Sequence, residues 1–150
     1  MSQVSVQHID KIYNNLEHIL KDLGLEVESG EFLVLLGPSG CGKTTLLNCI
    51  AGLIDLEGGS IFIGGKDVTD LDPKDRNIAM VFQSYALFPH MSIFDNVAYG
   101  LKMRKIPRRE IEERVNRIIH LVGLEATQKR KPSELSGGQQ QRIALARALV

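Results

Sequence analysis

A glycine-rich segment constrains the fold of this chain more than any other feature, because of what flanks it. Before it lies an apolar run, Phe32–Leu36, which we predict to be a strand buried on both faces, as in a parallel sheet. After it, a helix is predicted over Lys43–Ala51, closed by Gly52. The segment between them reads Gly37-Pro38-Ser39-Gly40-Cys41-Gly42-Lys43-Thr44-Thr45.

The pattern Gly-x-x-x-x-Gly-Lys-Thr between a strand and a helix is the P-loop, which binds the phosphates of a nucleotide. Its glycines let successive backbone N–H groups surround an anion, and the helix N-terminus adds a positive dipole end. We expect Lys43 to reach the β- and γ-phosphates as a catalytic residue. Thr44 would hold Mg²⁺ with its hydroxyl, and Thr45 would contact the α-phosphate. The other interpretation is a glycine-rich loop that only turns the chain and binds no ligand. Such a turn would not require a lysine at this position, nor a strand directly before the loop and a helix directly after it.

A second glycine pair begins the last predicted helix, which starts at Ser136 and runs to the end of the chain. The segment is Leu135-Ser136-Gly137-Gly138-Gln139. Ser136 and Gln139 fit a capping box, so a well-capped surface helix is one interpretation. However, two glycines in a first helical turn cost about 1 kcal/mol each relative to alanine. This cost is understandable if an anion approaches the bare backbone there, and the anion would belong to a nucleotide held by another subunit.

Apolar periodicity and turn residues predict the remaining elements. Two half-buried strands are expected over residues 4–8 and 25–27, followed by a hairpin with Gly64-Gly65 at its turn. Ile78–Phe82 has the composition of a second strand buried on both faces. Helices are expected over Ile93–Met103 and after Pro107, the second of them ending at Gly123.

Composition excludes several classes of protein. The net charge is zero, and the basic residues near Lys102–Arg109 interleave with acidic ones, so we expect a solvated helix face and no nucleic-acid partner. The two cysteines make no disulfide framework. Cys49 is expected in the core, while Cys41 lies in the P-loop, with a reactive thiol as the alternative. No apolar run is long enough to span a bilayer, so a membrane role would require a partner.

The order of the two glycine motifs resembles that of the nucleotide-binding (ATPase) subunit of an ATP-binding-cassette (ABC) transporter, over Val4 to Val150. This resemblance implies an α/β fold: a P-loop NTPase core with an N-terminal antiparallel β subdomain and a helical subdomain, truncated before the Walker B strand. Residues 1–92 would hold the β subdomain and the core up to the Q-loop. Residues 93–133 would be the helical subdomain, and residues 134–150 the signature motif and its helix.

The resemblance also implies how ATP and Mg²⁺ are bound. Two such subunits dimerise head to tail, and ATP lies between the P-loop of one, Gly37–Thr45, and the signature motif of the other, Leu135–Gln139. Gln83 matches the Q-loop glutamine, a catalytic and metal-contacting residue; the alternative is a polar strand end. Tyr13 matches the aromatic residue that stacks on adenine; the alternative is a partly exposed core tyrosine.

The stretch Phe82–Ser92 resembles the import-type subunits that energise prokaryotic uptake of sugars, polyamines, iron or inorganic anions. Asp72–Asn77 favours the carbohydrate branch. The implied partners are a membrane permease that contacts Gln83–Ser92, a second nucleotide-binding subunit and, indirectly, an extracytoplasmic substrate-binding protein. The implied location is peripheral, on the cytoplasmic face of the inner membrane. Four apolar side chains would line the permease groove or fill the core beneath it: Tyr85, Leu87, Phe88 and Met91.

The family's next element, an apolar strand that ends in Asp-Glu, does not occur between Met1 and Val150. Phosphoryl transfer depends on such positioned charges, so ATP hydrolysis is expected of the complete protein and not of these 150 residues alone. The apolar faces of Phe32–Leu36 would stay uncovered. The alternatives are a nucleotide-binding module without catalysis, or a non-transport ABC protein of DNA repair or translation. A simple P-loop kinase or GTPase would lack the Ser-Gly-Gly-Gln helix.

Overall fold

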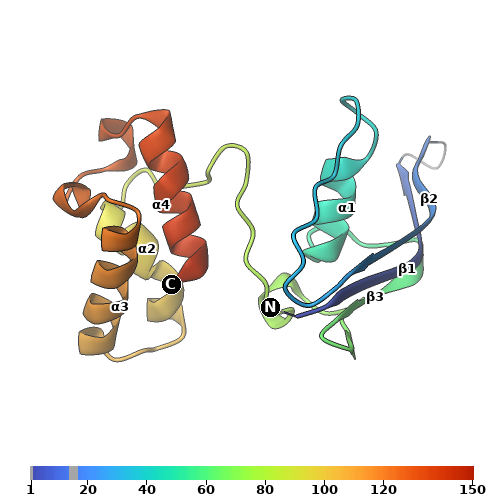
Figure 1. The fold of residues 1–150 in the computed structure, drawn as a ribbon, viewed down its shortest axis with the longest axis horizontal. Helices are drawn as coiled ribbons and strands as arrows, with labels where there is room; N and C mark the ends of the chain where they lie inside the picture. Colours follow the sequence, from blue (N-terminus) through green and yellow to red (C-terminus); the bar gives the residue numbers. More distant parts are fainter. Residues whose placement is uncertain (1, 14–16) are drawn as a thin grey trace. The chain divides into compact units, whose positions relative to one another are not determined.

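The computed structural model describes residues 2–13 and 17–150, which form two compact units (Figure 1). The first unit is Met1–Ile78 and the second is Ala79–Val150. Each unit has its own hydrophobic core. The subdomain boundaries expected from the sequence, after residues 92 and 133, stay predictions.

The first unit is built on a four-stranded antiparallel sheet with the order β2-β1-β3-β4. Its strands are β1 (Val4–Tyr13), β2 (Glu17–Val27), β3 (Gly58–Ile63) and β4 (Lys66–Asp67). The predicted hairpin is confirmed, with Gly64 and Gly65 at its turn. Strands β1 and β2 extend beyond the predicted ranges. Their pairing shifts register at several points, beginning between Val6 and Ile9, and the predicted strand ended where the first shift occurs. Both residues are buried, so the apolar period changes from two to three and the alternating pattern is lost.

Helix α1 (Lys43–Ile50) packs its buried residues, Leu46 and Cys49, into the core of the first unit. The prediction that Cys49 is a core residue is therefore confirmed. Arg76 closes the far end of this helix, because its Nη1 donates hydrogen bonds to the carbonyls of Cys49 (2.9 Å) and Ile50 (3.1 Å). A cationic side chain that caps the last carbonyls of a helix also complements the negative end of the helix dipole.

The second unit contains three α-helices, α2 (Ile93–Met103), α3 (Arg108–Leu121) and α4 (Gly137–Leu149). All three match the predicted ones. Gly123 follows α3 with φ +66°, the left-handed conformation expected of a residue that ends a helix. The apolar stripes of the helices meet in one core, whose fully buried members are Ile93, Val97, Ala98, Val115, Ile119, Ile143 and Ala146.

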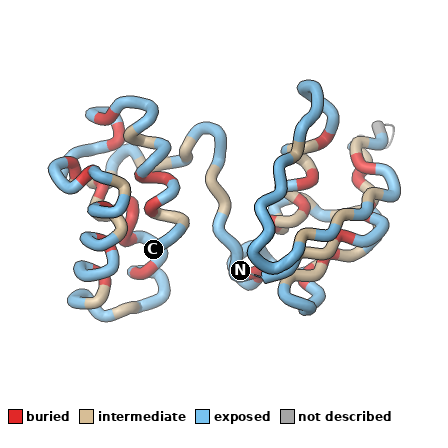
Figure 2. The backbone as a smooth tube through the Cα atoms, in the orientation of Figure 1, coloured by how far each residue is buried: buried red, intermediate tan, exposed pale blue. Residues whose placement is uncertain are grey.

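Two predicted strands are not formed, Phe32–Leu36 and Ile78–Phe82. A strand of a parallel sheet needs a hydrogen-bonded neighbour, and within the described residues every paired strand belongs to the antiparallel sheet. The expectation that the first run would be uncovered is confirmed: Phe32 is 89% exposed and Leu36 is 87% exposed. Figure 2 shows the chain before α1 as exposed along almost its whole length.

Candidate functional site

The P-loop segment forms an open turn that leads into α1. Gly40 and Gly42 have φ values of +86° and +93°, which only glycine adopts without strain. Gly42 is the N-cap of α1, and within the described part of the chain no side chain caps this helix. The first N–H groups of a helix have no intrahelical acceptor, so an uncapped first turn offers its donors to a ligand.

Lys43 folds back over the loop. Its Nζ donates hydrogen bonds to the carbonyl oxygens of Gly37 (2.8 Å) and Pro38 (2.7 Å), and contacts Cys41 Sγ at 3.3 Å. The ammonium group therefore lies close to two carbonyl oxygens of the loop itself. Thr44 is exposed, and Thr45 is half-buried.

The base of the loop packs on β2. A Cβ at Gly42 would lie 3.1 Å from Leu20 Cδ2 and 3.2 Å from the Ile19 carbonyl oxygen, so glycine also allows this close approach. Leu20 pairs with Lys11 of β1, and Tyr13 follows two residues later on the same strand. Two strand residues span roughly 7 Å, so Tyr13 lies about that far along β1 from Lys11, the partner of Leu20.

Tyr13 is 38% exposed, and Lys11 Nζ lies 5.5 Å from the centre of its ring. Lys11 is itself held by Glu57 Oε1 (2.8 Å) and by the Asp55 carbonyl oxygen (2.8 Å). The hydrogen bond with Glu57 raises the pKa of Lys11 and lowers that of Glu57, so the pair is ionised at neutral pH. The tyrosine ring is thus approached by a fixed cation and still has surface open to solvent.

The second glycine motif has the predicted cap geometry. The Gln139 N–H donates to Ser136 Oγ (3.4 Å), and the Ser136 N–H donates to Gln139 Oε1 (2.9 Å). Leu135 is buried. Gly137 and Gly138 are exposed, and a Cβ at either position would meet no atom within 4 Å. The local packing therefore does not require these two glycines. That a ligand approaches the backbone there stays a prediction.

Gln83 is exposed and lies in a turn closed by the Tyr85 N–H and the Phe82 carbonyl (2.9 Å). It belongs to the second unit, whereas Thr44 belongs to the first. Its roles in magnesium binding and catalysis stay predictions.

Sequence reasoning missed two side chains that fix the segment after Gln83. Asn96 is fully buried: its Oδ1 accepts from the Phe88 N–H (2.8 Å), and its Nδ2 donates to the Ser92 carbonyl (2.9 Å). Arg147 of α4 donates to the carbonyls of Tyr85 and Ala86. One sequence signal could have identified Asn96, because it is a polar residue on the apolar face of a predicted helix.

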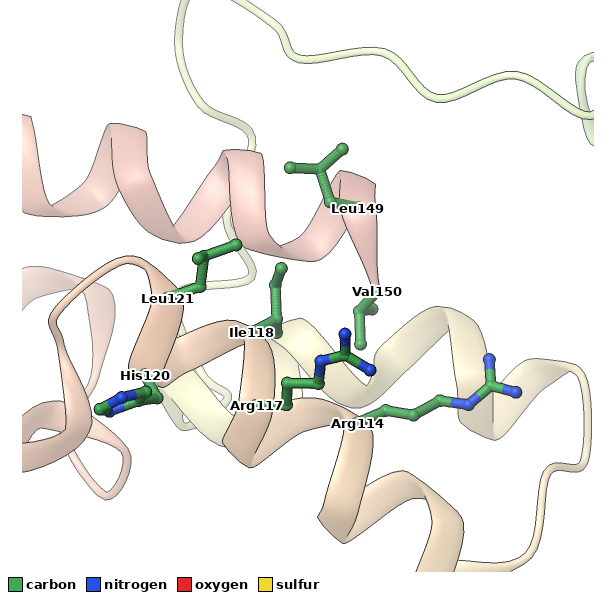
Figure 3. A pocket seen from close by; sticks show the side chains of 7 residues that line it. All are labelled: Arg114, Arg117, Ile118, His120, Leu121, Leu149 and Val150. Atoms are coloured by element: carbon green, nitrogen blue, oxygen red, sulfur yellow. The ribbon is translucent and has the colours of Figure 1, made fainter. Parts of the chain in front are cut away.

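A surface hollow of about 710 Å³ lies between α3 and the last turn of α4 (Figure 3). No residue of either glycine motif lines it, and α4 is about 20 Å long, so the hollow lies at the opposite end of the helix from Gly137. It is therefore not part of the candidate site. The lining residues are Arg114, Arg117, Ile118, His120, Leu121, Leu149 and Val150.

Comparison with known proteins identifies relatives along the whole chain. YcjV of Escherichia coli (strain 536), described as an uncharacterized ABC transporter ATP-binding protein, is 57% identical over 150 residues. The sn-glycerol-3-phosphate import ATP-binding protein UgpC of Yersinia pseudotuberculosis and the oligosaccharides import ATP-binding protein MsmX of Bacillus subtilis are each 51% identical over 150 residues. All three alignments cover 100% of this chain. The chain spans 42%, 42% and 41% of the lengths of these relatives.

Among the described residues, no helix has the length and apolar character needed to cross a membrane. The family model for ABC transporters matches residues 20–150, which include both glycine motifs, and this chain belongs to that family.

Proposed function

We propose that this chain binds Mg-ATP through its P-loop and, in the complete protein, hydrolyses it to power the import of a small solute. The observation that carries the proposal is the uncapped first turn of α1, with Lys43 folded over the loop beside it. A helix N-terminus with free N–H donors and an adjacent ammonium group is complementary to a polyphosphate. The residues proposed to bind the phosphates are those of Gly37–Thr45, with Mg²⁺ at Thr44 and Gln83.

The second glycine motif is proposed to bind the nucleotide of a partner copy. In support, Gly137 and Gly138 leave the start of α4 open and uncrowded, and Tyr13 would stack on adenine. Two copies arranged head to tail would then enclose two nucleotides. We propose that the 150 residues alone have negligible ATPase activity, because they contain no apolar strand that ends in Asp-Glu and could polarise water.

The test is a thermal melt of the chain with and without Mg-ATP. A ligand that binds only the folded state adds about 2.7 kcal/mol at a hundredfold excess over Kd. We expect an upward shift in the wild type and none in Lys43→Ala. A cooperative melt that Mg-ATP does not move would refute the proposal.

The proposed solute is a carbohydrate or a related small molecule, and the proposed partner is a membrane permease that contacts Gln83–Ser92 on the cytoplasmic face. The relatives named for import of oligosaccharides and sn-glycerol-3-phosphate support this choice. An extracytoplasmic binding protein would deliver the solute to the permease. Co-purification of the full-length gene product from its native membranes separates this proposal from a non-transport ABC protein, for which no permease would be recovered.

A further inference from the structure

Two consecutive residues after Gln83 adopt an unfavourable backbone conformation. Tyr85 has φ +61° and Ala86 has φ +47°. Residues other than glycine rarely adopt this left-handed region, and they stay there only when their surroundings hold them. Something in the structure must therefore fix this turn.

The group that fixes it is the guanidinium of Arg147. Its Nη1 donates to the Ala86 carbonyl at 2.7 Å, and its Nη2 donates to the Tyr85 carbonyl at 3.0 Å. Its Cζ also lies 5.5 Å from the centre of the Phe88 ring. A planar fork with several donors can hold two neighbouring carbonyls at once, which the single ammonium of lysine cannot do in the same geometry.

Arg147 is half-buried, and among the described residues no carboxylate forms an ion pair with it. Within the part of the chain that the structure describes, its side-chain partners are the two carbonyls and the Phe88 ring. Within the described residues, the positive charge of Arg147 therefore interacts with this turn and with no surface carboxylate.

Arg147 also connects the turn to the glycine pair, because both lie on α4. Gly137 begins this helix, and Arg147 lies in its last turn, roughly 15 Å further along a rigid rod. Asn96 separately fastens Phe88 and Ser92 to α2. The turn at residues 85–86 thus depends on α4, and the rest of the segment depends on α2.

We propose that Arg147 is a positioning residue that transmits nucleotide engagement at the start of α4 to the permease-facing turn at Tyr85–Ala86. This inference rests on the proposed function, since it requires a nucleotide at Gly137–Gly138 and a permease at Gln83–Ser92. When α4 shifts, the guanidinium of Arg147 shifts with it, and its two hydrogen bonds move the carbonyls of Tyr85 and Ala86.

Hydrogen–deuterium exchange of the full-length gene product tests this inference, with a non-hydrolysable Mg-ATP analogue as the probe. Exchange is followed in the peptides that contain residues 83–92 and 135–139, in wild type, Arg147→Met and Arg147→Lys. Arg142→Met is the matched control, because Arg142 lies on the same helix and its Nη1 donates to a backbone carbonyl, that of Val122 (2.8 Å). Nucleotide affinity is measured on the same samples.

We expect the analogue to slow exchange in both peptides of the wild type and of Arg142→Met. In Arg147→Met the slowing over residues 83–92 falls at least threefold, while that over residues 135–139 and the affinity change less than twofold. Arg147→Lys keeps the positive charge and the aliphatic part of the side chain, and we expect the same loss of slowing over residues 83–92. This variant replaces Arg147→Met in the test if the methionine variant does not fold. Persistence of the response over residues 83–92 in both variants overturns the inference. Absence of nucleotide binding in the wild type instead refutes the proposed function.

Discussion

Gly52 tests whether the buried Arg76 holds the P-loop helix in place. The two are in close contact: a Cβ at Gly52 would lie 2.4 Å from Arg76 Nε and 2.7 Å from its Cζ. Arg76 is 5% exposed, and its guanidinium cannot move away without losing its hydrogen bonds. Besides its bonds to α1, its Nε donates to the Leu71 carbonyl (2.8 Å) and its Nη2 to the Thr69 carbonyl (2.8 Å).

The expected cost of Gly52→Ala has two parts. Gly52 has φ +72°, and a left-handed alanine costs about 1–2 kcal/mol. Displacing the guanidinium breaks bonds to a charged group that are worth about 1.5–3 kcal/mol each, so the loss of one or two adds about 3 kcal/mol. Gly65→Ala is the matched control, because Gly65 has φ +77° and a Cβ there would meet nothing within 4 Å.

The assay is thiol labelling of Cys49 under native conditions, resolved by mass spectrometry from the labelling of Cys41. Cys49 is 1% exposed, lies on α1, and reacts only when the first unit opens. Since 1.36 kcal/mol corresponds to a factor of ten, we expect Gly52→Ala to label roughly a hundredfold faster than Gly65→Ala. In an Arg76→Met background this difference should vanish. Equal labelling rates for the two alanine variants would show that Arg76 does not hold the helix.

Three further outcomes are expected. Asn96→Leu should lower stability by about 2–4 kcal/mol, because it leaves the Phe88 N–H without its acceptor, whereas Asn116→Leu at an exposed site should cost less than about 0.5 kcal/mol in the same denaturant titration. The hydrogen bond from Lys11 lowers the pKa of Glu57 in the folded state. The stability that this bond contributes is therefore fully present above the ordinary pKa of 4.5 and is lost as the pH falls through the folded pKa. In an acid titration, Glu57→Gln should accordingly lose less stability below pH 4.5 than the wild type. Maleimide should label exposed Cys41 faster than Cys49, and Mg-ATP should protect Cys41 in the wild type but not in Lys43→Ala.

The sequence predicted well those elements whose signal is local. Each helix of the second unit has its own apolar period and its own end signals, and the Ser136–Gln139 capping box has the geometry that its spacing requires. Strands β1 and β2 were predicted only in part, because their continuation depends on bulges. His8 and Asp22 both have positive φ at these irregularities. Histidine and aspartate are enriched at positive φ, but most of them lie elsewhere, so the residue type alone does not mark the position of a bulge.

The side chains that fix the loops were not predictable, for a different reason. Arg76 and Arg147 donate to carbonyls that are 27 and 62 residues away in the chain. A carbonyl exists at every position, so the sequence does not indicate which one an arginine will reach. In the sequence, both residues are indistinguishable from charged residues of the surface. For the candidate site, the pattern therefore predicted the two glycine motifs but not the arginines that hold their surroundings.

Phe32–Leu36 shows why even a strong local signal can fail. Five consecutive apolar residues before a P-loop have the composition of a strand buried on both faces, yet Phe32, Val34 and Leu36 are exposed by more than half. Strand propensity describes how well side chains fit a pleated surface that already has neighbours, and it does not supply the neighbour's hydrogen bonds. Within the described residues the P-loop is consequently held from the α1 side, where Gly42 meets Leu20. The backbone donors nearest α1 are thus fixed by the fold of the first unit, whereas Gly37 is held within the loop, by the hydrogen bond from Lys43 Nζ to its carbonyl (2.8 Å).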